Sequence, residues 1–140
     1  MNINLIHKIR TSFQQTFKTE PLMIFSPGRI NIIGEHVDYN DGFVMPAAIN
    51  KYVCFAIAES GTSQCTLVAL DLDKTYTFNL RDELNPVADM WVNYILGVVS
   101  PLKKQLKGFN IAFSSTIPMG SGLSSSAAVE CGAAFALNTL

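Results

Sequence analysis

A short segment of the 140-residue sequence, between Gly34 and Gly42, concentrates side chains that could bind a polar ligand. Glu35, His36 and Asp38 lie within four consecutive positions. Carboxylates and an imidazole grouped in this way can accept hydrogen bonds from several neighbouring hydroxyl groups, and carboxylate acceptors make the stronger, charge-assisted kind. Because sugars present such hydroxyls, the segment is a candidate sugar-binding loop. The alternatives are an ordinary polar loop or a metal site, although the spacing fits no common zinc pattern.

The residues just before this loop contribute a cation, Arg29, which lies six residues ahead of Glu35. A guanidinium can stabilise charge on a transferring phosphoryl group, or it can hold a catalytic carboxylate in place. A surface salt bridge is the alternative role. Arg29 is therefore a candidate for chemistry next to the loop.

A second segment, Gly120 to Ser126, combines glycines and serines at the start of an expected helix. Two glycines separated by one residue allow a sharp turn and a close approach of a ligand to backbone amides. The helix that follows offers unsatisfied N–H groups and the positive end of its dipole, which suit a phosphate. The serine hydroxyls could bind phosphate oxygens or Mg²⁺. The alternative is a flexible turn before a serine-capped helix.

The segment differs from two better-known phosphate-binding sequences. No GKS or GKT follows the glycines, so it is not a Walker A loop. A dinucleotide fingerprint would need a third glycine, and Ser125 occupies that position. If the segment binds phosphate, it does so with loop amides and hydroxyls, without a lysine.

Hydrophobic spacing predicts the elements that position these segments. Helices are expected at residues 4–18 and 90–104, with Asn4 and Asp89 as their N-caps. From about residue 125 onward, a run of small residues predicts a third helix that packs tightly on the sheet. Strands are expected at residues 22–25, 51–59, 65–70, 75–80 and 108–115. The first strand should break at 26–28, and the middle three should form an antiparallel meander. Mixed strands and helices of this kind favour an α+β fold.

Composition restricts the classes of partner. Hydrophobic residues make up 49% of the chain and charged residues 15%, with a net charge of −1. Such a chain can bury a core and has no general attraction to nucleic acid or anionic membranes. It contains no apolar run of spanning length and no recognisable signal peptide. The three scattered cysteines predict reduced, mostly buried thiols and a cytoplasmic protein.

The chain ends at Leu140, inside the last expected helix, without the glycine, proline or basic residues that often close one. A C-terminus within a helix is uncommon. We therefore expect this sequence to be a fragment of a longer protein.

Taken together, the two segments resemble the galactokinases of the GHMP small-molecule kinase superfamily. Residues 28–39, GRINIIGEHVDY, are similar to the family signature G-R-x-N-[LI]-I-G-E-H-x-D-Y. Residues 118–127, PMGSGLSSSA, are similar to the superfamily phosphate loop P-x-G-x-G-L-x-S-S-A. The resemblance implies a GHMP-kinase N-terminal domain, with a mixed sheet and helices on one side, spanning residues 1–140.

The resemblance also assigns roles. It implies that Glu35, His36, Val37 and Asp38 bind galactose, that Tyr39 and Gly42 help to shape their loop, and that Arg29 stabilises the transition state. The implied nucleotide site wraps the ATP phosphates with Gly120, Ser121, Gly122, Leu123, Ser124, Ser125 and Ser126, and Ser126 is the implied Mg²⁺ ligand. Trp91 and Tyr94 match an aromatic pair near the adenine, although their helical spacing also suits core residues.

The implied reaction transfers the ATP γ-phosphoryl group to the anomeric hydroxyl of α-D-galactose, in a parent enzyme expected to be a monomer. The family's catalytic aspartate and its acidic Mg²⁺ ligand lie downstream of the phosphate loop. After Ser126 the chain offers only Glu130, for which a structural role is expected. We therefore expect residues 1–140 alone to lack a C-terminal domain and to be inactive.

Three alternatives remain open at the level of sequence. The first is a kinase for a related sugar, such as N-acetylgalactosamine or arabinose. The second is a non-catalytic regulator that binds galactose and ATP. Such relatives lose the Ser-Ala pair after the phosphate loop, whereas Ser126-Ala127 is intact here. The third is a structural domain without activity of its own.

Overall fold

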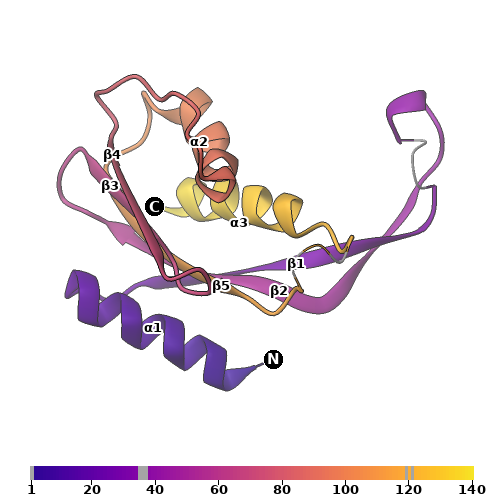
Figure 1. Ribbon diagram of the computed structural model, residues 1–140, viewed down its shortest axis with the longest axis horizontal. Coiled ribbons are helices and arrows are strands. Elements are labelled where there is room, and N and C mark those ends of the chain that lie inside the picture. The colour runs from indigo at the N-terminus through magenta and orange to yellow at the C-terminus, as the bar shows by residue number, and fades with distance from the viewer. Residues whose placement is uncertain (1, 35–37, 119, 121) are drawn as a thin grey trace.

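The structure is a computed structural model that describes residues 2–34, 38–118, 120 and 122–140, with only the backbone described for Asp38. Within these residues, three α-helices and five strands follow one another as α1 (Ile3–Phe17), β1 (Leu22–Ile33), β2 (Met45–Glu59), β3 (Gln64–Ala69), β4 (Lys74–Asn79), α2 (Met90–Leu102), β5 (Phe109–Ser115) and α3 (Ser125–Thr139). A 3-10 turn, η1 (Asp38–Asn40), lies between β1 and β2. The strands form one sheet in the order β1-β2-β5-β3-β4. The chain is thus α+β, as predicted (Figure 1).

The predicted meander of β2, β3 and β4 is wrong in one pairing. β3 and β4 form the expected antiparallel hairpin, but β5 lies between β2 and β3. β5 pairs antiparallel with β2 and parallel with β3, which makes the sheet mixed. The reason is burial: four consecutive residues of β5, Ile111–Ser114, are buried, so this strand needs cover on both faces and belongs at the sheet centre.

The helices cover both faces of the sheet, so the expectation of helices on one side is incomplete. Helices α2 and α3 pack on the face that carries Val53, Phe55 and Ile57 of β2. Helix α1 packs on the opposite face through Ile9 and Phe13, as Figure 1 shows. Alternate residues of β2 point to opposite faces, and its apolar run is continuous, so each face presents apolar side chains that need a helix.

The predicted break at residues 26–28 does not end β1. Pairing with β2 continues from Leu22 to Ile33, with a register shift between Pro27 and Arg29. β1 is an edge strand, where a proline without an N–H can be accommodated, and the irregularity absorbs the remaining strain. As a result β1 and β2 extend beyond the rest of the sheet as a long hairpin (Figure 1).

The helix starts differ slightly from prediction. Asn2, not Asn4, is the N-cap of α1, and its side chain accepts a hydrogen bond from the Leu5 amide at 3.2 Å. Asp89 occupies the N-cap of α2 as predicted, but its carboxylate bonds Lys74 at 2.5 Å and caps no amide.

Among the described residues, no helix has both the length and the hydropathy needed to cross a bilayer.

Helix α3 approaches the sheet very closely. A Cβ atom added at Gly132 would lie 2.3 Å from the Phe55 ring and 2.8 Å from Cβ of Ser26. The small residues of the segment Ala127 to Ala136 allow this approach, which confirms the predicted tight packing of the last helix. The packing fixes the start of α3 relative to β1 and β2.

Candidate functional site

The site is built where β1 meets the glycine- and serine-rich loop. The backbone amide of Arg29 donates a hydrogen bond to the carbonyl oxygen of Leu123 at 3.3 Å. A Cβ atom at Gly28 would lie 3.0 Å from the same oxygen, so the strand backbone touches the loop directly. Two segments about ninety residues apart in sequence therefore adjoin, and each carries one of the two candidate motifs.

The loop and the start of α3 present backbone amides. Gly120 and Gly122 have φ angles of 69° and 71°, conformations that glycine adopts without penalty. Ser124 is the N-cap of α3, but its side chain makes no capping hydrogen bond. The first amides of the helix are therefore not satisfied by their own N-cap, which is what an anion site requires. Met119 and Ser121 lie outside the described residues.

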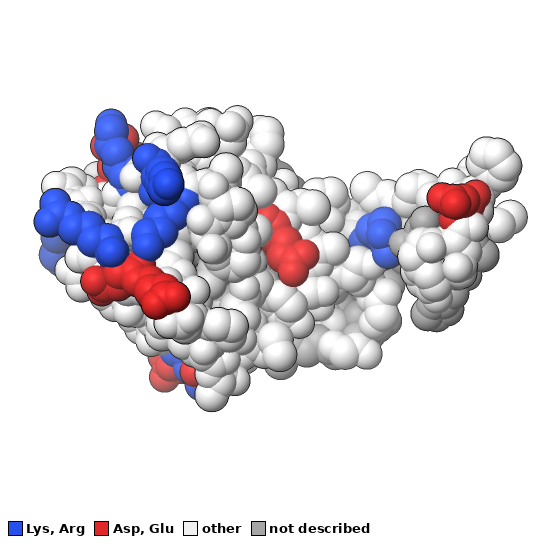
Figure 2. All heavy atoms as spheres, turned by 90° about the horizontal axis from the view of Figure 1, so that it is seen from above, with Lys and Arg blue, Asp and Glu red and all other residues white. Residues whose placement is uncertain are grey.

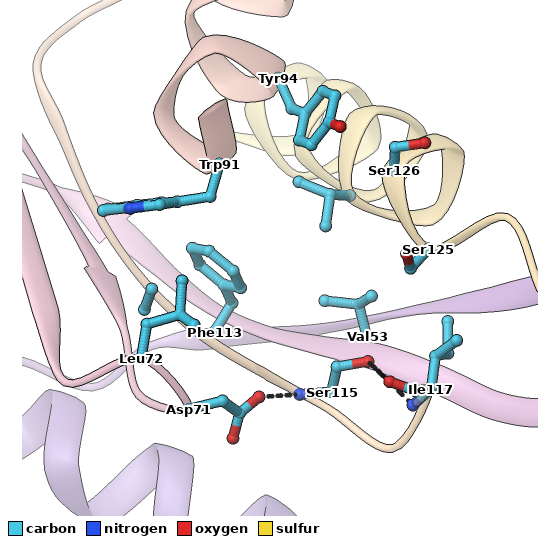
Figure 3. Close-up of a pocket in the computed structure, with 12 residues that line it drawn as sticks. Val53, Asp71, Leu72, Trp91, Tyr94, Phe113, Ser115, Ile117, Ser125 and Ser126 are labelled. Carbon is cyan, nitrogen blue, oxygen red and sulfur yellow. Dashed lines mark hydrogen bonds between the residues drawn. The ribbon is translucent and has the colours of Figure 1, made fainter. Parts of the chain in front are cut away.

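A cavity of about 300 Å³ opens beside the start of α3. Four predicted nucleotide residues line it: Trp91, Tyr94, Ser125 and Ser126. Figure 3 shows the two aromatic residues on α2 and the two serines at the start of α3, with Val53, Phe113 and Ser115 of the sheet on the other side. The predicted aromatic pair and the last two serines of the predicted phosphate loop therefore line the same cavity.

Trp91 combines the two roles that the sequence left open. Its ring packs on Phe113 with centroids 5.8 Å apart, so it belongs in part to the core. It also lines the cavity, and its indole Nε1 is buried without a hydrogen-bond partner among the described residues. Contact of Trp91 or Tyr94 with a nucleotide stays a prediction.

Several lining residues were not anticipated as site residues. Asp71 lines the cavity together with Leu72 and Ser115. Its carboxylate accepts hydrogen bonds from the Ser114 hydroxyl at 2.6 Å and from the Ser115 amide at 2.7 Å. The missing information was the parallel pairing of β3 with β5, which sets Asp71 beside Ser115. The sequence signal that could have indicated this contact is the presence of polar residues, Asp71 and Ser114-Ser115, at the ends of β3 and β5.

The predicted sugar residues can be placed only in part. Glu35, His36 and Val37 lie outside the described residues, and for Asp38 the structure gives only its backbone position at the start of η1. Arg29 is exposed on β1, next to the phosphate loop. The segment that carries the other four residues follows directly after β1, so it starts from the strand that touches the loop.

The charged side chains are distributed unevenly. On the face shown in Figure 2, most Lys and Arg side chains gather at the end of the molecule away from the β1–β2 hairpin. Two ion pairs, Lys107 with Glu59 and Lys74 with Asp89, involve partners that are both substantially exposed. Arg29 is the cation on the strand that touches the loop, so an anion at the start of α3 would lie near backbone amides, hydroxyl groups and this residue.

The cysteines are free, and two of them are inaccessible. Burial raises the pKa of the Cys54 and Cys65 thiols to about 11, so both are protonated near neutral pH. Cys131 is exposed, so two of the three thiols are buried, in line with the expectation of mostly buried thiols. Among the described residues no group of three or more His, Cys, Asp or Glu side chains could hold a metal ion.

Comparisons with known proteins agree with this geometry. The model of the galactokinase galactose-binding signature matches residues 11–59, and the model of the GHMP kinases N-terminal domain matches residues 93–140. A galactokinase of Glaesserella parasuis is 44% identical over 126 residues, covering 86% of this chain and 33% of the relative. A Haemophilus influenzae galactokinase is 42% identical over 134 residues, covering 89% of this chain and 34% of the relative.

Solved structures show the same fold. The Lactococcus lactis galactokinase complexed with galactose superposes with a TM-score of 0.85 at 32% identity, over 96% of this chain and 38% of that one. The Methanococcus jannaschii mevalonate kinase gives a TM-score of 0.73 at 27% identity, over 87% of this chain and 41% of that one.

The fold and the arrangement of the loop define an N-terminal domain of the GHMP small-molecule kinases. Within that superfamily the chain belongs to the galactokinase family, because the signature, the curated relatives and the solved structure agree. The chain spans about a third of the length of the curated relatives it matches.

Proposed function

We propose that this chain forms the N-terminal part of a galactokinase, which transfers the γ-phosphoryl group of ATP to the anomeric hydroxyl of α-D-galactose. The observation that carries the proposal is the contact between Arg29 of β1 and Leu123 of the glycine- and serine-rich loop. This contact sets the strand that leads into the sugar segment beside the phosphate loop. A donor phosphate and an acceptor hydroxyl must meet in this way, because catalysis of phosphoryl transfer rests on positioning and electrostatics.

The proposed roles follow the match of each segment to the motifs of the galactokinase family. Glu35, His36, Val37 and Asp38 bind the sugar, and Arg29 stabilises the charge that develops on the transferring group. The loop from Gly120 to Ser126 surrounds the phosphates with amides and hydroxyl groups, and the cavity beside Trp91 and Tyr94 holds the adenine. The cavity's size and aromatic lining support the last assignment.

ATP is used with Mg²⁺, and Ser126 is the residue of this chain proposed to bind the ion. The Ser126 side chain lines the cavity, is half-buried and has no hydrogen bond to a described residue. A hydroxyl oxygen is the kind of ligand that Mg²⁺ accepts. When bound, the ion would neutralise charge on the phosphate oxygens.

Residues 1–140 are proposed to bind both substrates but not to turn them over. The family's catalytic aspartate has no counterpart among the residues that follow Ser126, and Glu130 is exposed in the second turn of α3. A coupled assay should show no galactose-dependent ATP consumption by this chain. Robust turnover would refute this part of the proposal.

Two alternatives can be separated from this function. A kinase for N-acetylgalactosamine or arabinose would bind those sugars more tightly than galactose. A galactose- and ATP-binding regulator would bind a protein partner in a ligand-dependent manner, and the intact Ser126-Ala127 pair at the start of α3 argues against it.

Buried, unpaired Cys54 and Cys65 suit a reducing compartment, so we place the parent, as a monomer, in the cytoplasm.

Two substitutions test the proposed division of the site. Gly122→Val forces a branched side chain onto a residue with a φ of 71° inside the loop, so it should weaken ATP binding and leave galactose binding unchanged. Asp38→Ala removes one charge-assisted hydrogen bond and should cost roughly 1.5–3 kcal/mol in galactose binding alone.

Isothermal titration of both variants with MgATP and with galactose provides the measurement. Matching unfolding curves for the two variants and the unmodified chain serve as the control for folding. If each variant lost affinity for both ligands equally, the assignment of the two segments would be wrong.

A further inference from the structure

Asp71 connects the end of β3 to the strand that leads into the phosphate loop. The parallel register pairs Ala69 of β3 with Phe113 of β5, so Asp71 and Ser115 stand at equivalent positions two residues further along. The ladder continues to this point, because the Leu70 amide donates to the Phe113 carbonyl at 3.0 Å. Asp71 is therefore held beside the end of β5 by the sheet itself.

The Asp71 carboxylate uses both oxygens on β5. One oxygen accepts from the Ser114 hydroxyl at 2.6 Å, and the other accepts from the Ser115 amide at 2.7 Å. Ser114 has no exposed surface whereas Asp71 is exposed, so the first of these bonds is partly buried. Because a carboxylate accepts it, the bond is of the stronger, charge-assisted kind. Figure 3 shows the carboxylate directed at the Ser115 backbone at the edge of the cavity.

The bonds continue from Ser115 toward the loop. The Ser115 hydroxyl accepts from the Ile117 amide at 2.9 Å, which turns the chain just before Pro118. On the other side, Thr116 and Tyr52 exchange hydrogen bonds, with the Thr116 amide donating to the Tyr52 carbonyl at 2.9 Å. The segment that leads into the phosphate loop is thus tied to β3 by Asp71 and to β2 by Tyr52.

We propose that Asp71 is a positioning residue for the phosphate loop: its carboxylate fixes Ser114 and Ser115 so that the loop amides meet the nucleotide phosphates. This inference rests on the proposed function, since it concerns the same loop. An acidic group so close to a phosphate site would by itself repel the ligand. Its two bonds to β5 explain why a carboxylate can nevertheless serve there.

The test uses the single tryptophan of the chain, Trp91, as a fluorescent reporter in the cavity. Fluorescence titrations with MgATP and with adenosine are compared for the unmodified chain, Asp71→Ala and Asp71→Asn. Asp71→Ala should weaken MgATP binding by about tenfold, because the loop loses its two anchoring bonds. Adenosine binding should change less than twofold, since adenosine carries no phosphates.

The conservative variant separates position from charge. An asparagine can still accept from the Ser115 amide and donate to the Ser114 hydroxyl, so Asp71→Asn should recover most of the MgATP affinity. Asp73→Asn is the matched control. It removes a charge from the same turn at a residue whose φ of 50° suits asparagine and whose side chain makes no bond to a described residue.

A second measurement does not depend on any ligand. Amide hydrogen exchange at Ser115 and Ile117 should be faster in Asp71→Ala than in the unmodified chain, while exchange in β2 is unchanged. If Asp71→Ala does not fold, Ser114→Ala provides the same test, because it removes only the hydroxyl that donates to the carboxylate.

The outcomes are distinct. Loss of MgATP affinity alone, with recovery in Asp71→Asn, supports the inference. Equal loss of MgATP and adenosine, or unchanged MgATP affinity with unchanged exchange, overturns it. If the unmodified chain does not bind MgATP, the proposed function is contradicted. In that case, faster amide exchange at Ser115 and Ile117 in Asp71→Ala would still support the positioning of the loop by Asp71.

Discussion

Gly132 and Gly97 both lie within helices, yet their surroundings differ completely. A Cβ atom at Gly132 would collide with Phe55 and Ser26, whereas nothing lies within 4 Å of a Cβ atom at Gly97. Gly132 therefore sets the distance between α3 and the sheet, and through it the place of the phosphate loop. At Gly97 the absence of a side chain only costs conformational entropy.

This contrast gives a prediction with an internal control. Gly132→Ala should destabilise the fold by roughly 1–3 kcal/mol, because packed neighbours would have to shift. Gly97→Ala should stabilise it by roughly 0.5–1 kcal/mol, as expected for an unobstructed helix position. Urea unfolding monitored by circular dichroism measures both. Equal effects of the two changes would show that α3 does not pack as described.

The buried thiols of Cys54 and Cys65 predict a loss of stability in alkali. Their folded-state pKa of about 11 lies above the value of an unfolded cysteine, so the native state retains protons that the unfolded state releases. The contribution is complete below the unfolded pKa and is lost as the pH rises toward 11.

The free energy of unfolding should therefore fall between about pH 8 and about pH 10.5 more steeply in the unmodified chain than in Cys54→Ala/Cys65→Ala. Cys131→Ala is the control, because that thiol is exposed and should leave the slope unchanged. A double variant with the same slope as the unmodified chain would show that these thiols ionise freely in the fold.

At the scale of elements, α1 offers a test of its true start. Asn2→Ala should cost about 1 kcal/mol, because it removes the acceptor for the Leu5 amide. Asn4→Ala should be neutral or slightly stabilising, since alanine favours helix interiors and Asn4 is exposed. Thermal unfolding distinguishes the two, and a larger loss in Asn4→Ala would restore the cap predicted from sequence.

The elements themselves were largely predictable from the sequence. Amphipathic spacing located the first two helices and a run of small residues located the third. Apolar, β-branched or aromatic runs located the five strands. The order of the strands in the sheet was harder to predict than the strands themselves. The central position of β5 depends on how deeply each strand is buried relative to the others, which is a property of the whole sheet. Pro27 suggested a break, but at a sheet edge a proline costs no ladder hydrogen bond.

The candidate site was predictable where it follows a local motif. The loop from Gly120 to Ser126 was a candidate because of its glycines and serines, whereas Trp91 and Tyr94 became candidates only through the resemblance to the family. Asp71 could not, since its role depends on a parallel pairing between strands forty residues apart. The local sequence indicates which amides and hydroxyl groups could bind phosphate. The side chains proposed to hold those groups in place are found only from the strand pairing of the sheet.

At the scale of the whole molecule, the extended β1–β2 hairpin presents much apolar surface. Phe43 is 99% exposed and Ile33 69%, and both lie on the part of the chain that carries the sugar segment. Together with a length of about a third of the relatives, they make self-association of this chain an expected behaviour.

The central claim, that the loop before α3 holds nucleotide phosphates while the segment after β1 holds a hexose, can be mapped in one experiment. Amide chemical shifts of the labelled chain are followed during separate titrations with MgATP and with galactose. We predict that MgATP shifts the amides of residues 120–126 and those around Asp71 and Trp91, and that galactose shifts those of residues 29–42. A folded chain in which neither ligand moves these two groups of amides, or in which both ligands move the same group, would contradict the account.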